Sequence, residues 1–160
     1  MQVETISYDL ENGWSGDFPA LDSQRTLVLV FGGANLRDSV EPFEQLEQAY
    51  PEAIITGCSS AGEIYQTTIC DDTLAVAIAR FDAGELSLAT TTISKADNSF
   101  AAGQDLAQQL QKSALRGVFV LSDGLNVNGA ELVDGFNKGL AEGVVVTGGM
   151  AGDGDRFKST

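Results

Sequence analysis

Two buried strands joined by one helix constrain the fold of this chain more than any other feature. Residues 27–31 form a continuous apolar run that ends at Gly32 and Gly33, as expected of a strand covered on both faces. Helical spacing of apolar residues predicts a helix over about 39–50, and a second buried strand follows at 53–56. A crossover of this length makes the two strands parallel and their connection right-handed.

The second half of the chain repeats this pattern. A buried strand is predicted at 117–121, a helix capped by Asn128 follows, and another strand covers 144–147. The turns also match, because a Gly-x-Asn turn recurs 91 positions later and an Ala-Gly-acid turn recurs 90 positions later. We favour an ancient duplication over the alternative that two such units converge on similar glycine turns.

A hairpin is predicted after the first unit, from the strand-like runs 73–81 and 86–93 and the short glycine loop between them. The sequence therefore predicts an α/β fold, with a mixed sheet built from two similar β-α-β units plus an antiparallel hairpin, and with helices packed on the sheet. We expect residues 1–160 to be a single, incomplete domain, since the second unit lacks a hairpin of its own. Exposed strand edges would then favour a homo-oligomer.

The composition disfavours several classes of partner and of catalysis. Acidic residues outnumber basic ones 23 to 9, so the net charge of −14 disfavours nucleic acids and anionic membranes as partners. Histidine is absent, which removes histidine-based catalysis and histidine-ligated metals. No secretory signal or spanning run is visible, and a cytoplasmic location is expected.

Candidate ligand-binding residues lie in the glycine-rich turns, because the carboxyl ends of parallel strands gather ligands. Amide groups there suit an anion, and the acids Glu63, Asp123 and Asp153 would suit an ammonium group, so an amino acid is one candidate. A Ca²⁺ or Mg²⁺ site, or acids that only cap their own turns, are the alternatives. The predicted set is Gly57, Cys58, Ser59, Ser60, Gly62, Glu63, Ser122, Asp123, Gly124, Asn126, Asn128, Gly148, Gly149, Gly152 and Asp153.

Three ordered motifs resemble the N-terminal domain of the FIST family. They are GCSSAGEI at 57–64, LSDGLNVNG at 121–129 and TGGMAGDG at 147–154. The resemblance runs from about residue 27 to the end and implies a sensory domain that binds small ligands and acts on signalling partners. It also implies a longer N-terminal domain followed by a C-terminal FIST domain. Some members are linked to haem and nitric oxide, for which only Cys58 or Met150 could serve as ligands here.

The resulting hypothesis is a sensor domain that binds a small ligand, passes the signal to a protein partner, and needs no cofactor or metal. One alternative is a hydrolase or transferase with Cys58 or a nearby serine as nucleophile, although no histidine is present to activate it. Another is an interaction domain without a pocket. Binding would shift a conformational population that the partner detects.

Overall fold

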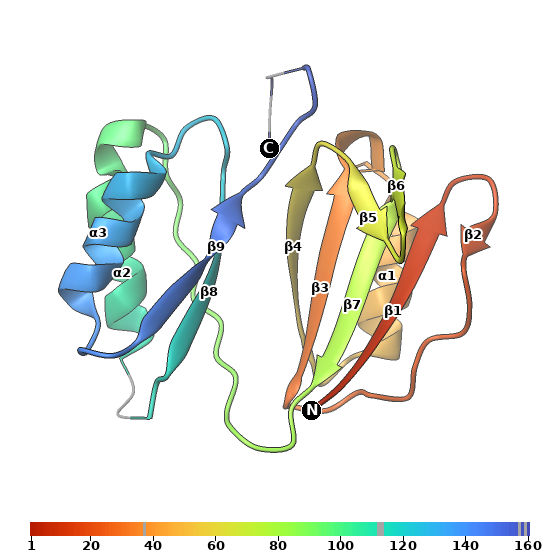
Figure 1. Cartoon of the computed structure of the whole chain (residues 1–160), viewed down its shortest axis with the longest axis horizontal. Coiled ribbons are helices and arrows are strands. Elements are labelled where there is room, and N and C mark those ends of the chain that lie inside the picture. The colour runs from red at the N-terminus through yellow and green to blue at the C-terminus, as the bar shows by residue number, and fades with distance from the viewer. Residues whose placement is uncertain (37, 112–113, 157, 159) are drawn as a thin grey trace. The chain divides into compact units, whose positions relative to one another are not determined.

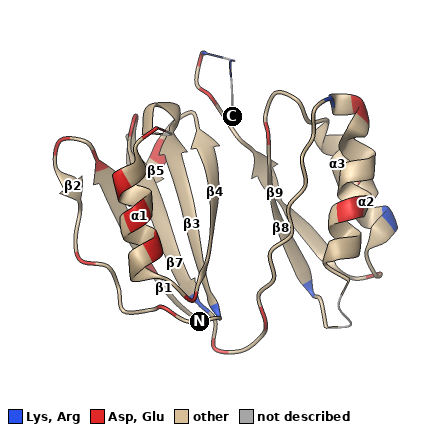
Figure 2. Cartoon of the chain, turned by 180° about the vertical axis from the view of Figure 1, so that it is seen from behind, with Lys and Arg blue, Asp and Glu red and all other residues tan. Residues whose placement is uncertain are grey.

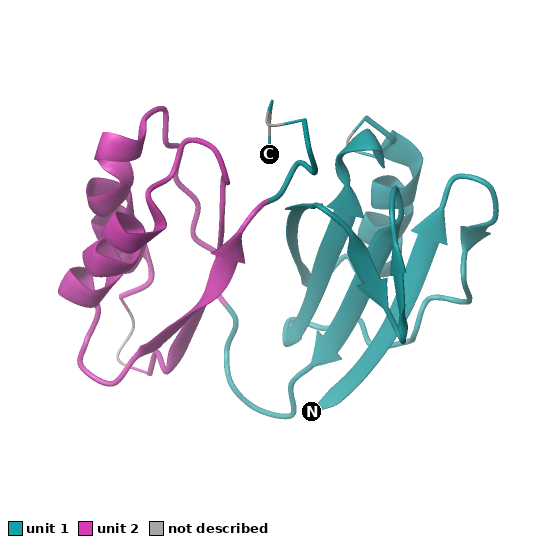
Figure 3. Ribbon diagram, turned by 45° about the horizontal axis from the view of Figure 1, so that its top comes forward, with its two compact units in different colours: residues 1–86, 152–160 teal, residues 87–151 magenta. Residues whose placement is uncertain are grey.

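The computed structural model describes residues 1–36, 38–111, 114–156, 158 and 160. The chain divides into two compact units, which Figure 3 colours separately. Unit 1 contains residues 1–86 and 152–160, and unit 2 contains residues 87–151. The α/β class and the mixed sheet that the sequence predicts are confirmed.

Unit 1 is built on a five-stranded sheet with the order β2-β1-β7-β3-β4 (Figure 1). Its strands are β1 (Gln2–Asp9), β2 (Gly13–Trp14), β3 (Thr26–Gly33), β4 (Ile54–Ser60) and β7 (Leu74–Arg80). β3 and β4 pair in parallel as predicted, while β7 pairs antiparallel with both β1 and β3. A short hairpin of β5 (Glu63–Tyr65) and β6 (Thr68–Cys70) connects β4 to β7.

One helix covers a face of this sheet. The helix α1 (Val40–Ala49) follows β3 after the 3₁₀ turn η1 (Ala34–Leu36) and precedes β4. Leu46 from α1 packs with Val28 and Val30 of β3 and with Ile78 of β7 in one buried cluster. Alternate residues of β3 and β7 are buried in this core, which is the period-two pattern of a sheet with a helix on one face.

The hairpin predicted from 73–81 and 86–93 is wrong. Residues 74–80 do form β7, but residues 86–93 carry no strand. Both edges of β7 are already paired, one with β1 and the other with β3, so no edge remains for the following segment. Ala89 and Ile93 instead pack against the apolar core of unit 2.

Unit 2 has a two-stranded parallel sheet of β8 (Gly117–Ser122) and β9 (Val145–Met150). It also has the 3₁₀ turn η2 (Ala96–Asn98) and the helices α2 (Ser99–Gln109) and α3 (Gly129–Gly139). The side chain of Asn128 accepts hydrogen bonds from the amides of Ala130 and Glu131, so the predicted helix cap is confirmed. These strands form a sheet of their own and do not extend the sheet of unit 1.

The acidic excess is visible on the exposed side of α1, where Glu41, Glu44 and Glu47 recur every three residues (Figure 2). Among the described residues, every helix is too short or too polar to cross a lipid bilayer.

Candidate functional site

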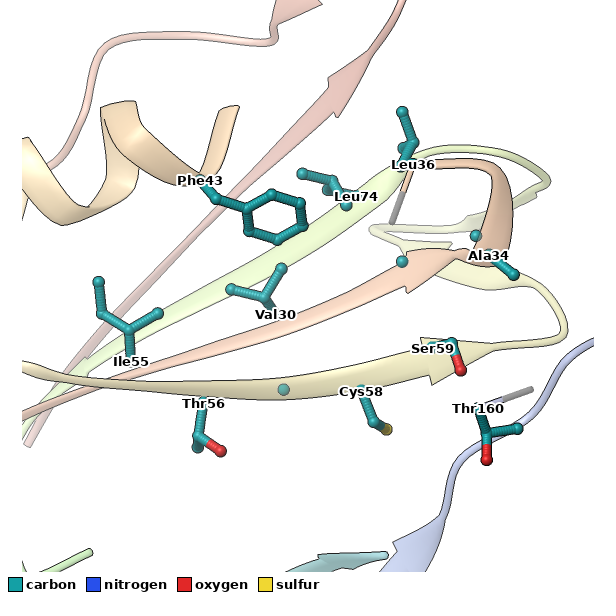
Figure 4. Close-up of a pocket in the computed structure, with 13 residues that line it drawn as sticks. Val30, Ala34, Leu36, Phe43, Ile55, Thr56, Cys58, Ser59, Leu74 and Thr160 are labelled. Atoms are coloured by element: carbon teal, nitrogen blue, oxygen red, sulfur yellow. The ribbon is translucent and has the colours of Figure 1, made fainter. Parts of the chain in front are cut away.

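A pocket of about 340 Å³ lies in unit 1 at the carboxyl ends of β3 and β4 (Figure 4). Apolar side chains form most of its wall, and a few hydroxyl and thiol groups lie beside them. Its lining comprises Val30, Gly32, Gly33, Ala34, Leu36, Phe43, Ile55, Thr56, Gly57, Cys58, Ser59, Leu74 and Thr160. This is the position at which α/β sheets hold ligands, and the volume lies within the range of small-molecule sites.

The pocket reaches around the outer edge of β4. This strand is the last in the sheet, and its successive side chains point to opposite faces. Ile55 and Thr56 both line the pocket although they are neighbours in sequence. In Figure 4, Phe43 lies on the helix side of the strands, while Cys58 lies on the other side. An apolar compartment is therefore continuous with a more polar one.

Gly57 allows β4 to approach β3 closely at this point. A Cβ atom built on Gly57 would lie 1.9 Å from the carbonyl oxygen of Val30, its partner in the register. Because that neighbour is backbone, a side chain there could be accommodated only if the strands separated.

Ser59 carries the most informative polar atom of the pocket. Its Oγ is buried and has no hydrogen-bond partner within the described part of the chain. A buried hydroxyl without a partner costs free energy, so natural structures rarely keep one without a reason. The neighbouring thiol of Cys58 is half-buried, and burial raises its pKa. Burial thus disfavours the thiolate, which is the form that attacks as a nucleophile.

The buried carboxylate of Glu63 stabilises the loop that follows β4. It is 1 % exposed. Its Oε1 accepts a hydrogen bond from the hydroxyl of Ser60 at 2.7 Å, and its Oε2 accepts from the amide and hydroxyl of Thr73 at 3.1 and 3.2 Å. These contacts join the end of β4 to the start of β7 and engage both carboxyl oxygens.

The segment after β9 returns to unit 1 and lies beside the pocket. The amide of Gly152 donates to the carbonyl of Ser59 at 3.0 Å, and Thr160 lines the pocket itself. Asp153 is 7 % exposed, and its carboxylate lies 3.2 Å from Nε of Arg156. The guanidinium group of Arg156 also donates to Asn35, at the start of η1.

The predicted site residues of unit 2 lie near the carboxyl ends of its own strands, β8 and β9. Oδ1 of Asp123 accepts from the amides of Leu125 and Asn126 at 2.6 and 2.7 Å, so this acid organises its own turn. Ser122 and Gly124 flank Asp123, while Asn128 begins α3. Gly148 and Gly149 belong to β9. That the turns of both units surround one ligand stays a prediction.

Of the predicted residues, the pocket brings together Gly57, Cys58 and Ser59, with Ser60, Gly62, Glu63, Gly152 and Asp153 beside them in sequence or by contact. The sequence analysis did not include Phe43, Leu74, Leu36 or Thr160 in the site. Phe43 and Leu74 read as core residues, because helical and strand periodicity cannot distinguish a packed core from the wall of a cavity.

No group of three or more cysteine, aspartate or glutamate side chains that could hold a metal ion is found among the described residues. The fold and the pocket together define the class: an α/β domain with two β-α-β units and a hollow at the carboxyl ends of the first parallel pair.

Comparison with known protein families identifies the family to which this chain belongs. The family model of the FIST N domain matches residues 26–160, and the chain belongs to this family of sensory, signal-transduction domains. The resemblance noted in the sequence is thereby confirmed. No curated protein and no solved structure matches the chain.

Proposed function

We propose that unit 1 is the ligand-binding part of a sensor, and that its pocket takes a small molecule with an apolar body and a polar end that pairs with Ser59. The observation that carries this proposal is the buried, unpartnered hydroxyl of Ser59 at the wall of an apolar pocket. A ligand group that forms a hydrogen bond with this hydroxyl would remove the free-energy cost of burying it without a partner. That hydrogen bond would therefore contribute more to the binding free energy than one made to a hydroxyl exposed to water.

The lining favours some ligands over others. Val30, Phe43 and Leu74 offer apolar contact, and no charged side chain lines the pocket among the described residues. Both carboxyl oxygens of Glu63 are engaged by neighbours, and Asp153 is paired with Arg156. Among amino acids, those with aliphatic or aromatic side chains therefore fit the pocket better than charged ones.

The signal would leave through the segment 152–160. This segment touches the end of β4 through Gly152 and lines the pocket through Thr160, so a ligand that contacts β4 also contacts the segment. A bound molecule would stabilise the arrangement in which Arg156 bridges Asp153 and Asn35. A signalling protein that binds this arrangement more tightly than one without the Arg156 contacts would then respond to ligand.

A thermal-shift screen tests the proposal. The panel contains leucine, phenylalanine, aspartate and lysine, with titration calorimetry for each molecule that raises the melting temperature. A ligand at a hundredfold excess over its Kd adds about 2.7 kcal/mol to folding stability, which is readily measured. We expect leucine or phenylalanine to act and the charged amino acids not to act.

A matched pair of variants locates the site. Cys58→Leu places a larger side chain in the pocket, whereas Cys70→Leu makes the same change in β6, outside the lining. Binding that is lost in the first variant and kept in the second supports the proposal. Equal affinity in both variants, or a preference for the charged amino acids, would show that the pocket is not the site.

The raised pKa of the Cys58 thiol favours binding over the nucleophilic alternative, because only the thiolate attacks. The absence of histidine from the sequence supports the same choice.

A further inference from the structure

One buried position of β3 carries no side chain where the pocket opens. Alternate residues of this strand are buried, and Val28, Val30 and Gly32 follow one another toward its carboxyl end. Their partners across the sheet are buried aliphatic residues of β7, namely Ile78, Val76 and Leu74. The row of paired core side chains is therefore complete up to Gly32, where β3 contributes none.

Leu74 covers part of the space that Gly32 leaves. A Cβ atom built on Gly32 would lie 2.5 Å from Cδ2 of Leu74, which is well inside van der Waals contact. The side chain of Leu74 therefore lies over the backbone of β3 at this point. Both residues line the pocket, so the remaining space beside them belongs to the pocket.

The obstacle to a side chain at Gly32 differs from that at the next glycine. A Cβ atom on Gly33 would lie 2.7 Å from Cα of Asp72, which is backbone and moves only with the chain. At Gly32 the nearest atom is the end of a flexible side chain, and the φ angle of Gly32 is not positive. A methyl group at position 32 is therefore accommodated when Leu74 changes its rotamer. Because Leu74 is otherwise enclosed by the core, the pocket is the space into which it turns.

The apolar compartment of the pocket is part of this core. Val30 and Leu74 belong to the buried cluster of unit 1, and Phe43 packs against that cluster. Figure 4 shows the side chains of these three residues on the helix side of β3. Protein interiors are closely packed, so a hollow bordered by such side chains changes its capacity with each methyl group added or removed.

We propose that Gly32 and Leu74 together set the size of the apolar ligand body that the pocket accepts. This inference rests on the proposed function, because it concerns the ligand of the same pocket. Gly32 leaves the space, and Leu74 forms the wall that limits it. A methyl group at position 32 moves Leu74 into the pocket and excludes large ligands first, whereas a smaller residue at position 74 admits them. One methylene group in an apolar pocket changes selectivity by roughly 10- to 200-fold.

The test measures how affinity depends on ligand size. Leucine and phenylalanine are titrated against the whole chain by calorimetry, and the neutral probes benzene and n-butylbenzene are titrated by NMR chemical shifts. We expect Gly32→Ala to weaken binding of phenylalanine and n-butylbenzene by about tenfold more than binding of leucine and benzene. Leu74→Ala should shift the preference by about tenfold in the opposite direction, toward the larger molecule of each pair.

A double variant separates this mechanism from a general loosening of the core. In the Leu74→Ala background, Gly32→Ala should change the size preference by less than about threefold, because its effect acts through Leu74. Leu46→Ala is the matched control, since it removes the same atoms from the same core outside the pocket lining and should leave the preference unchanged. Leu74→Val replaces Leu74→Ala if circular dichroism shows that the latter does not fold.

The outcomes distinguish this inference from the proposed function. An equal loss for small and large ligands in Gly32→Ala, or the same effect of that substitution with and without Leu74, would overturn the inference and leave the pocket as the binding site. If only the two amino acids fail to bind the parent chain, the amino-acid assignment falls, and the two neutral probes still test the roles of Gly32 and Leu74. If all four molecules fail to bind, both the inference and the proposed function are wrong.

Discussion

Two adjacent serines at the end of β4 should respond to the same substitution with opposite signs. The Oγ of Ser59 is buried without a hydrogen-bond partner, whereas that of Ser60 donates to the buried carboxyl group of Glu63 at 2.7 Å. An unpaired buried hydroxyl costs about 1–3 kcal/mol, so Ser59→Ala should stabilise the ligand-free protein by about 1 kcal/mol. Ser60→Ala leaves a carboxyl oxygen short of a donor and should destabilise by about 2 kcal/mol.

Urea denaturation gives the free energies of unfolding, and the loss of far-UV circular dichroism on heating gives the melting temperatures. The gap of about 3 kcal/mol between the two variants corresponds to roughly 10 °C in melting temperature for a domain of this size. Each variant removes one hydroxyl from neighbouring positions, so each is the control for the other. Destabilisation by Ser59→Ala as large as that by Ser60→Ala would refute the inference that the Ser59 hydroxyl is held ready for a ligand.

Three further outcomes follow from the same contacts. Gly57→Ala places a Cβ atom 1.9 Å from the backbone of Val30, so it should lower the free energy of unfolding by about 3 kcal/mol in urea denaturation. Gly16→Ala is the control: a Cβ atom there has nothing within 4 Å, so the free energy of unfolding should change by less than about 0.5 kcal/mol. Burial raises the pKa of Tyr50 to about 12. Folding stability should therefore fall as the pH rises from the ordinary phenol pKa of about 10 to about 12. An absorbance titration should find one tyrosine that ionises late, and Tyr50→Phe should remove that transition. Cys58 should react with a maleimide more slowly than glutathione at about pH 8, since burial raises its pKa; faster reaction would revive the nucleophilic alternative.

The regular elements could be predicted because their signals are local. The apolar run at 27–31 and the capped helix after Asn128 each depend on residues within one turn or one strand, and the structure contains both. The pairing of 86–93 could not be predicted in this way. That segment reads as a strand, yet the one neighbour it could reach by a short turn already has both edges occupied.

The site was predictable only in part. The sequence predicted a glycine-rich turn from Gly57 onward; the structure extends β4 through Gly57 to Ser60, and the pocket lies at this part of the strand. The same residues gave no sign that both oxygens of Glu63 would be engaged by Ser60 and Thr73, because Thr73 is ten positions away. Phe43 of α1 lines the pocket for a similar reason: a helical apolar stripe fixes which side faces the sheet, but not how completely it fills the space.

By itself, the sequence determined the α/β class, the two parallel strand pairs with their similar glycine turns, and the lack of any histidine for catalysis. The tertiary structure decided which strand joins which edge, which acids are engaged, and that one serine hydroxyl remains buried without a partner. The division has a physical reason. Periodicity and capping are properties of neighbouring residues, whereas edge pairing and hydrogen-bond satisfaction depend on groups far apart in the chain that meet only on folding.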